Sequence, residues 1–401
     1  MIIVRYVKNI LLITISALIG YAGFTTTPRA ATLILAVPVL WTLVDSRYTA
    51  FAVMLVYKLA ASRGLLPGAA VFLSENHTLL QAAILYILMS LGVSLPFLVF
   101  WNENPKEKAL CLILAFLTAY ILPPISLIGI INPLMASGTI FRGWGLDGIF
   151  YLLAIYITCA VSRKTAYVFL YVIALFAVLP GDSWYIHPIP NGIMAVDTSF
   201  GKLGSGSFNF ADDYERARMV FDELKRLGLA RTGVDVIVLP ETIAGRLNDT
   251  GLELWRGETA RLLPSKTVIF GAELPAGDGM KYDNAVIMLH DGEKHVVCQR
   301  IPVPYSMYRG PFAKTGANLH LWDDGILTLP NGSKAAVIIC YEAFLTWPFL
   351  ASMFHSPQDT TILSVANLWW CRETSLPAAQ KTAVNLWALT FGIPVVFARN
   401  I

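Results

Sequence analysis

The stretch AAVIICYEAF (335–344) decides how this chain is interpreted, because an apolar, strand-like segment runs directly into Cys340 and Glu342. A second run, VDVIVLPET (234–242), ends in a similar way on Glu241. A cysteine attacks a carbonyl carbon as its thiolate, so it needs a base that takes its proton. A carboxylate at the end of a buried strand can act as that base once burial has raised its pKa. The two runs therefore predict a thiol nucleophile, Cys340, with Glu241 as its general base.

Charge is distributed unevenly along the chain. The whole sequence is 56% hydrophobic and 14% charged, against about 25% charged in an ordinary soluble protein. Residues 1–180 hold 11 Lys or Arg and 5 Asp or Glu, whereas residues 181–401 hold 19 and 22. This split predicts a membrane domain at 1–180, a hinge at 181–190 and a soluble domain at 191–401. The net charge of +3 and the absence of a Lys/Arg-rich run exclude a surface suited to nucleic acid.

The first domain consists of a series of apolar runs. They lie at about 10–24, 31–44, 48–62, 79–101, 109–131, 147–162 and 166–180. A helix needs roughly 20 apolar residues to cross a bilayer, and the fourth and fifth runs reach that length while the others are shorter. We expect a bundle of six or seven transmembrane helices, with no further membrane helix after the last strand at 393–400.

The short loops indicate the orientation of these helices. With the N-terminus on the cytoplasmic side, most Lys and Arg of the loops, Arg47 and Lys106 among them, also fall on that side, as the positive-inside rule requires. The domain at 191–401 is then expected on the periplasmic side of the inner membrane. A cleavable signal peptide is the alternative for residues 1–24, but no clear cleavage site follows and further apolar runs do.

From residue 191 onward, short apolar segments alternate with charged amphipathic ones. Strands are expected at 191–199, 234–242, 266–274, 282–290, 294–302, 334–342, 360–368 and 393–400, and an amphipathic helix at 211–228. Asp291 and Gly292 between two of these strands predict a hairpin turn. Strands as apolar as VDVIVL are typical of sheets that are covered on both faces, so we expect an α/β domain with packed sheets and outer helices.

The cysteines and histidines do not form a metal-binding pattern. Cys111 and Cys159 lie in predicted membrane helices, which leaves Cys298, Cys340 and Cys371 in the outer domain. Three cysteines cannot all pair within one chain, so at least one thiol outside a disulfide is expected. No pair has zinc spacing, and His290 and His295, which flank the predicted hairpin, are expected at the surface. We expect neither a metal nor a cofactor.

Several motifs together resemble the nitrilase, or carbon–nitrogen hydrolase, superfamily. They are the Pro-Glu of VIVLPET, the Cys-Tyr-Glu of VIICYEA, and the segments YDNAVIML (282–289) and SVANLWW (364–370). With helices ahead of this domain, the chain most resembles the membrane-bound branch, which includes lipoprotein N-acyltransferases and conjugal transfer proteins. The resemblance implies an α-β-β-α sandwich with a Glu–Lys–Cys triad, in which Glu241 is the base and Cys340 the nucleophile.

The lysine of that triad is where this chain departs from the resemblance. The matching segment, QRIPVPYSM (299–307), offers Gln299 or Arg300 instead. Arg300 could hold an oxyanion by its charge, but its guanidinium is bulky and always protonated. Four further candidates are open to two interpretations each. Glu342 either assists Cys340 or pairs within the fold, and Tyr341, Tyr305 and Trp369 either line a substrate pocket or pack in the core.

The resemblance implies a function at the membrane. Expected chemistry is acyl transfer or amide hydrolysis through a thioester on Cys340, next to a phospholipid bilayer, with a lipid or lipoprotein as substrate and conjugative transfer proteins as partners. The alternative is a nitrilase-type domain that has lost catalysis and acts as a binding or scaffolding component of a conjugative envelope apparatus. A transporter is disfavoured, because no ionisable pair lies deep within the predicted helices.

Overall fold

The chain forms two compact units in the computed structural model, which describes residues 2–24, 27–72, 79–178, 187–202, 210–229, 233–277, 280–356 and 360–401. The helical unit comprises 1–186 with 344–347 and 371–392, and the α/β unit comprises 187–343, 348–370 and 393–401. Residues 181–186 of the predicted hinge lie outside the described residues. The division differs from the predicted domains in one respect, since two segments beyond residue 340 pack with the N-terminal helices.

The helical unit contains a helix in each of the predicted apolar runs. Its elements are α1 (Ile2–Gly23), α2 (Pro28–Thr32), η1 (Leu33–Leu35), α3 (Ala36–Leu43), α4 (Arg47–Ala61), α5 (Leu65–Phe72), α6 (Leu79–Val99), α7 (Pro105–Tyr120), η2 (Ile125–Ile128), η3 (Pro133–Thr139), α8 (Gly145–Val161), α9 (Arg163–Val178) and α13 (Leu376–Phe391). The helix α13 joins this unit by packing on η3 and α8.

Two of these helices, α1 and α6, are long and apolar enough to cross a membrane. A third crossing results if α4 and α5, which meet at a bend of 55°, form one span. The predicted run at 109–131 is not a single helix, because α7 ends at Tyr120, just before the Pro123–Pro124 pair. The second proline of that pair has no N–H to continue a helix, and the residue before a proline disfavours helical geometry.

Aromatic side chains fill the interior of the helical unit. Phe97 packs edge-on against both Trp41 and Phe116, and Phe116 stacks on Tyr156 with ring centroids 6.1 Å apart. The outward faces of α1, α6, α8 and α9 expose large apolar side chains, among them Leu18, Leu88 and Phe150. An apolar exterior around a packed interior is the arrangement that suits a helix bundle in lipid.

The α/β unit contains two sheets. The first has the order β1 (Ile193–Ala195), β2 (Val236–Val238), β3 (Thr267–Ala276), β4 (Lys281–His290) and β5 (Glu293–Cys298), with β6 (Gly316–Ala317) paired to β4. The second has the order β10 (Val395–Asn400), β9 (Thr360–Asn367), β8 (Lys334–Ile339) and β7 (Ile326–Thr328). The strands β1 to β3 run parallel, as do β8 to β10, and every predicted strand is present.

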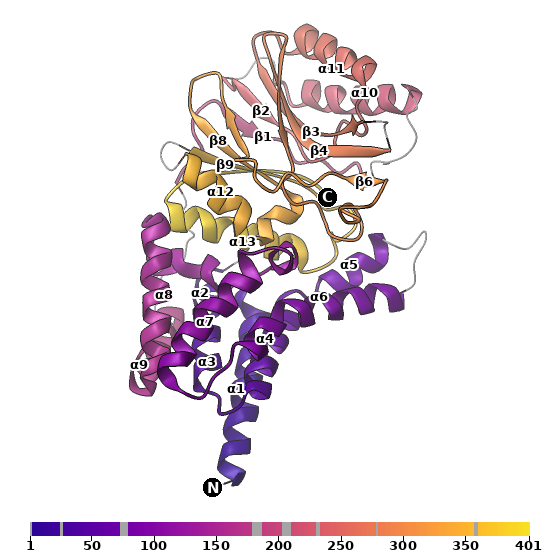
Figure 1. Ribbon diagram of the computed structural model, residues 1–401. Helices are drawn as coiled ribbons and strands as arrows, with labels where there is room; N and C mark the ends of the chain where they lie inside the picture. Colours follow the sequence, from indigo (N-terminus) through magenta and orange to yellow (C-terminus); the bar gives the residue numbers. More distant parts are fainter. Residues whose placement is uncertain are drawn as a thin grey trace. The chain divides into compact units, whose positions relative to one another are not determined.

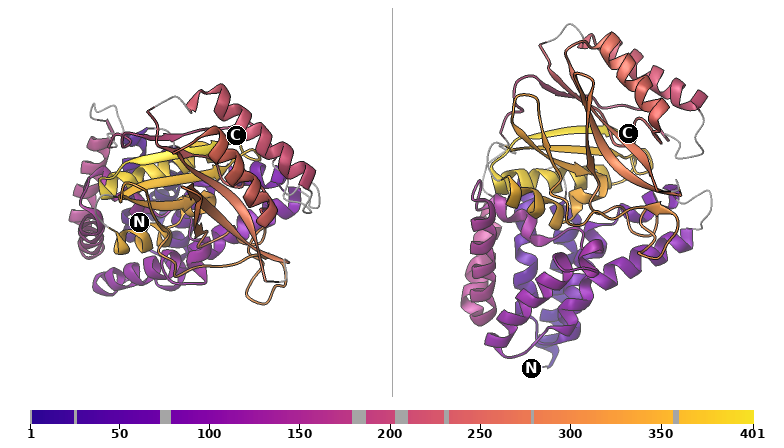
Figure 2. Two further views of the ribbon diagram at one scale, coloured as in Figure 1. Left: turned by 90° about the horizontal axis from the view of Figure 1, so that it is seen from above. Right: turned by 45° about the horizontal axis from the view of Figure 1, so that its top comes forward.

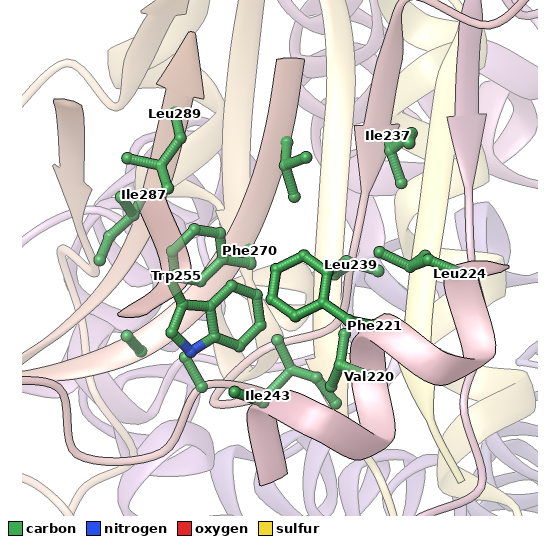
Figure 3. Packing of buried hydrophobic residues seen from close by; sticks show 14 of the residues in the cluster. Val220, Phe221, Leu224, Ile237, Leu239, Ile243, Trp255, Phe270, Ile287 and Leu289 are labelled. Carbon is green, nitrogen blue, oxygen red and sulfur yellow. The ribbon is translucent and has the colours of Figure 1, made fainter. Parts of the chain in front are cut away.

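Two helices, α10 (Phe210–Arg226) and α11 (Asp249–Leu262), cover one face of the first sheet (Figures 1 and 2). The predicted amphipathic face of α10 is buried at Ala217, Val220, Phe221 and Leu224. Figure 3 shows the core beneath them, where the Trp255 ring of α11 stacks on Phe270 of β3 with centroids 4.2 Å apart. Burying these large rings together with the surrounding aliphatic side chains stabilises the packing of the helices on the sheet.

The predicted hairpin is confirmed. Strands β4 and β5 pair antiparallel from His290 and Glu293 onward. Asp291 and Gly292 between them have φ of 47° and 79°, the left-handed backbone that a two-residue turn of this type requires. The turn sets the register of β4, which carries Asn284, and of β5, which leads directly to Gln299; both residues belong to the site described next.

Candidate functional site

Cys340 lies at a sharp turn between β8 and the 3-10 helix η5 (Cys340–Phe344). Its φ is +47°, a left-handed conformation that residues with a Cβ seldom adopt. The residue is 8% exposed. Strained backbone of this kind is common at active sites, so the conformation marks Cys340 as a candidate functional residue. The prediction that Cys340 follows a buried strand is confirmed.

Glu241 follows β2 and is 4% exposed. The next residue, Thr242, has φ of +55°, so the chain turns sharply here as well. The backbone of this turn is held to β3 by the N–H of Gly271, which donates to the carbonyl of Pro240 at 3.0 Å. A Cβ at Gly271 would lie 2.5 Å from the Cα of Glu241. Only glycine allows the two backbones to come this close.

A network of amide groups surrounds the Glu241 carboxylate. Asn284 of β4 donates through Nδ2 to Glu241 Oε1 and to Gln299 Oε1, both at 2.8 Å. Gln299 in turn donates through Nε2 to the carbonyl of Ile339, the residue before Cys340. The N–H of Asn367, at the end of β9, donates to Glu241 Oε2 at 2.9 Å. Residues from both sheets therefore meet at one carboxylate.

The environment of Glu241 suits a base. Burial raises the pKa of its carboxyl above the ordinary value, and the negative charge of Glu342 adds to this, while hydrogen bonds with Asn284, the Cys340 side chain and the Asn367 N–H act in the opposite direction. The structure thus brings Cys340 into hydrogen-bonding contact with Glu241. A carboxylate whose pKa is raised is a better proton acceptor for a thiol.

Arg300 and Glu342 form a buried ion pair of their own. Both side chains are 1% exposed, and their charged groups lie 3.3 Å apart. The Arg300 guanidinium also donates to the carbonyls of Val337, Asp324 and Pro348. Its donors are therefore occupied away from the Glu241 carboxylate. Glu342 accepts three backbone N–H groups, from Ile339, Arg300 and Ile301.

Of the two residues offered for the lysine position, Gln299 is the one that the structure brings to the network around Glu241. Tyr341 follows Cys340 and is 6% exposed, and burial raises the pKa of its hydroxyl well above the ordinary value. Tyr305 lies on a turn after β5 and is 53% exposed, with φ of +72°. The Trp369 ring follows β9, with the ammonium of Lys202 5.9 Å from its centroid.

Two conjugal transfer proteins are similar to this chain along nearly its whole length. It is 32% identical over 415 aligned residues to the conjugal transfer protein TraB of Agrobacterium fabrum, and the match covers 97% of this chain and 92% of that protein. The chain belongs to the TraB family of conjugal transfer proteins. A protein of Sinorhizobium fredii described as a probable conjugal transfer protein TraB is 29% identical, over 97% of each chain. A scan against protein-family models found no match.

Solved structures similar to this TraB-family chain include proteins of the carbon–nitrogen hydrolase superfamily. A carbon–nitrogen hydrolase from Helicobacter pylori G27 is 12% identical with a TM-score of 0.37, over 52% of this chain and 72% of that one. A CN-hydrolase superfamily protein from Xanthomonas campestris is 15% identical with a TM-score of 0.27, over 44% and 64%. The family assignment rests on the relatives that match along the whole length.

Two residues of the site were missed from the sequence of this TraB-family chain, Asn284 and Asn367. Asn284 precedes the apolar residues of YDNAVIML, and Asn367 follows the apolar residues of SVANLWW. That signal was present, because a buried amide needs partners and therefore marks a polar site within a core. Asn284 Oδ1 is buried and has no hydrogen-bond partner among the described residues, which leaves one acceptor beside Glu241 for another group.

The structure also brings together three possible metal ligands that the sequence keeps apart. They are Asp283, Cys298 and His320, whose ligand atoms lie within 4.8 Å of one another. None of the five cysteines, all within the described residues, forms a disulfide. Sequence spacing cannot reveal a cluster of this kind, because strand pairing and a loop assemble it.

Proposed function

We propose that this TraB-family protein is a membrane-anchored acyl-transfer or amide-hydrolysing enzyme that forms a thioester on Cys340. The observation that carries the proposal is the hydrogen-bonding contact between Cys340 and the buried Glu241, whose pKa is raised by burial. A thiol, a base and a turn that presents the thiol are the parts that nucleophilic catalysis needs. Burial of both groups excludes water and strengthens their interaction.

The proposed reaction has two halves. Glu241 takes the thiol proton as Sγ attacks an acyl carbonyl, and the tetrahedral intermediate collapses when the C–O or C–N bond breaks and the leaving group takes the proton from Glu241. An amine or water then attacks the thioester and gives its proton to Glu241. As the C–S bond breaks, that proton returns to Sγ and restores the free enzyme.

The proposed setting is the inner membrane. The apolar helices α1 and α6 supply candidate anchors, and exposed apolar side chains on α8 and α9 suit further contact with lipid. The proposal includes the multi-pass bundle, the periplasmic location of the α/β unit, and a phospholipid or lipoprotein substrate. Its partners would be other conjugative transfer proteins, the process after which the relatives are named.

A second candidate function is a scaffolding or binding role without catalysis, and a specific observation favours it. Gln299, which is neutral, stands at the position expected for the triad lysine. The guanidinium of Arg300 is paired with Glu342 and donates hydrogen bonds to three carbonyl groups. A tetrahedral oxyanion would then rely on neutral donors alone, which stabilise a developing charge less than a cation does.

Intact-mass measurement of the full chain, purified with its membrane phospholipids, distinguishes the two. The thioester proposal expects an acyl adduct that hydroxylamine removes, that is absent from Cys340→Ala and that persists in the control Cys111→Ser. An unmodified wild type, or an adduct retained by Cys340→Ala, contradicts the proposal. Unimpaired DNA transfer between cells by Cys340→Ala, together with no adduct on the wild type, would establish the scaffolding role instead.

A further inference from the structure

Three side chains of different chemistry meet beside the strands of the site. Asp283 comes from β4, Cys298 from the end of β5, and His320 from the loop after β6. Each side chain is partly buried, and their ligand atoms all lie within 4.8 Å of one another. Ligands bound to one zinc ion at about 2.0–2.3 Å lie within that range of one another. The cluster therefore has the dimensions of a metal site.

Other groups hold the cluster in orientation. Asn318 Nδ2 donates to Asp283 Oδ1 at 2.8 Å, and within the cluster His320 Nε2 lies 2.8 Å from the same oxygen. The other ring nitrogen, His320 Nδ1, lies 3.7 Å from the carboxylate of Asp323. The backbone N–H of His320 donates to the backbone carbonyl of Arg300 at 3.1 Å. The Asp323 carboxylate is therefore near the ring nitrogen that does not contact Asp283, where carboxylates commonly orient metal-binding imidazoles.

Two carboxylates, those of Asp283 and Asp323, give the cluster a negative charge that would attract a cation. The carboxylate of Asp283 lies within 4.8 Å of the Cys298 sulfur, and the carboxylate of Asp323 lies 3.7 Å from the ring of His320. A divalent ion would be attracted by the carboxylates and would displace the proton of the thiol.

We propose that Asp283, Cys298 and His320 bind a divalent transition-metal ion of the Zn²⁺ class. Thiolate and imidazole ligands select such an ion over Mg²⁺ or Ca²⁺, which prefer oxygen. Binding forms the metal–sulfur bond and releases the Cys298 proton to solvent. Three protein ligands leave one position of a tetrahedral ion for water.

The position of this metal site gives it a structural role. Asp283 precedes Asn284 on β4, and Cys298 precedes Gln299 directly after β5. Successive side chains of a strand point to opposite faces, so the ion would bind on the face opposite the Glu241 network. It would link β4, β5 and the loop at 318–323, and thereby stiffen the two segments that carry Asn284 and Gln299.

Cobalt titration of the metal-free full chain in detergent tests the proposal. Co²⁺ bound through Cys298 is expected to give a sulfur-to-metal charge-transfer band that saturates at one ion per chain. Cys298→Ser and His320→Ala should remove that band or weaken binding at least tenfold. The control His295→Ala, an exposed histidine on β5, should bind as the wild type does. No band in the wild type, or an unchanged band in Cys298→Ser, overturns the proposal.

A second measurement uses the native chain and does not depend on the folding of a variant. Zn²⁺ should slow alkylation of Cys298 by iodoacetamide at least tenfold, as measured by peptide mass spectrometry, and a chelator should reverse the effect. Cys111, which lies on α7, serves as the internal control and should react at the same rate throughout. Equal alkylation of Cys298 with and without Zn²⁺ would also overturn the proposal.

Discussion

Arg300 and Glu342 form an ion pair that is buried beside the candidate site. Both side chains are withdrawn from water, and each charge is compensated by the other and by backbone groups. Removing one partner leaves the other as an uncompensated buried charge, which is costly, whereas removing both is much less so. The residue that could be taken for a catalytic cation thus has a structural role in the conformation described.

The first prediction concerns this pair. Arg300→Met is expected to lower the free energy of unfolding by roughly 3–5 kcal/mol, because Glu342 is then buried without a partner. The double variant Arg300→Met/Glu342→Leu should recover a large part of that loss. Urea unfolding of the detergent-solubilised chain, followed by tryptophan fluorescence, measures both, with Arg309→Met at an exposed position as control. A double variant as unstable as the sum of its single variants would contradict the explanation.

The second prediction concerns Glu273 of β3, which is 8% exposed. Burial raises the pKa of its carboxyl from 4.5 to about 7, with Glu241 adding to the rise and Arg246 and Arg216 opposing it. Because the folded-state pKa is the higher one, the stabilisation is complete below about pH 4.5 and is lost as pH rises through 7. A shift of this size corresponds to about 3 kcal/mol.

Comparison of wild type with Glu273→Gln between pH 5 and pH 8 isolates this effect. The glutamine variant should lose less stability than the wild type over that interval, since its amide does not ionise. Hydrogen exchange of the β3 amides provides a local measurement, and protection in the wild type should fall as pH rises after correction for the intrinsic exchange rate. Parallel pH profiles for the two proteins would show that Glu273 is not the group responsible.

At the scale of elements, the close approach of β3 to the turn after β2 positions Glu241. The third prediction follows from this contact. Gly271→Ala places a methyl group 2.5 Å from the Cα of Glu241, so either the turn or β3 must move. Overpacking of this kind costs about 1–3 kcal/mol or more of folding free energy. Because Glu241 is displaced, any adduct formation at Cys340 should also be lost.

A matched control exists on α11. A Cβ at Gly257 would meet no atom within 4 Å, and alanine is the better helix former by up to about 1 kcal/mol. Gly257→Ala should therefore leave stability unchanged or raise it, and leave Cys340 chemistry unaffected. Equal effects of the two substitutions on thermal unfolding would show that the contact at Gly271 is not tight.

Another element-scale feature lies a few residues beyond Cys340. Lys58 of α4 donates to the carbonyl of Ile131 at 2.9 Å, and the N–H of Ile131 donates to the carbonyl of Phe344. Asn132 also donates to the hydroxyl of Thr346 at 2.8 Å. The segment 344–347 therefore belongs to the helical unit, whereas Ala343, the residue before it, belongs to the α/β unit.

At the scale of the whole molecule, the fourth prediction concerns topology. Phe312 is 97% exposed on the α/β unit, and Lys106 lies at the start of α7, on the side expected to face the cytoplasm. In intact cells with a permeabilised outer membrane, a membrane-impermeant maleimide should label Phe312→Cys above the level of the parent protein. It should label Lys106→Cys only after lysis. The reverse pattern would place the α/β unit in the cytoplasm.

Much of the α/β unit could be predicted from local patterns. Apolar runs of strand length, the face of α10 and the Asp291–Gly292 turn each carry their own physical signal. The helices α11, α12 (Trp347–His355) and α13 were not predicted. Segment 344–354 is so apolar that its composition does not distinguish a helix in a core from a segment that enters lipid. The membership of α13 in the helical unit depends on its contacts with η3 and α8, which lie more than 200 residues away.

The sequence by itself determined the family, the run of apolar helices and the positions of the strands along the chain. It also placed Cys340 and Glu241 each after a buried strand. These depend on short-range pattern and on motifs, which a single sequence carries. Only the tertiary structure decided that Gln299 rather than Arg300 joins the Glu241 network, that Asn284 and Asn367 complete it, and that Asp283, Cys298 and His320 form a cluster. Neighbouring residues of a strand point to opposite faces of the sheet. A difference of one position along the chain therefore decides whether a side chain enters the site or lies on the other face.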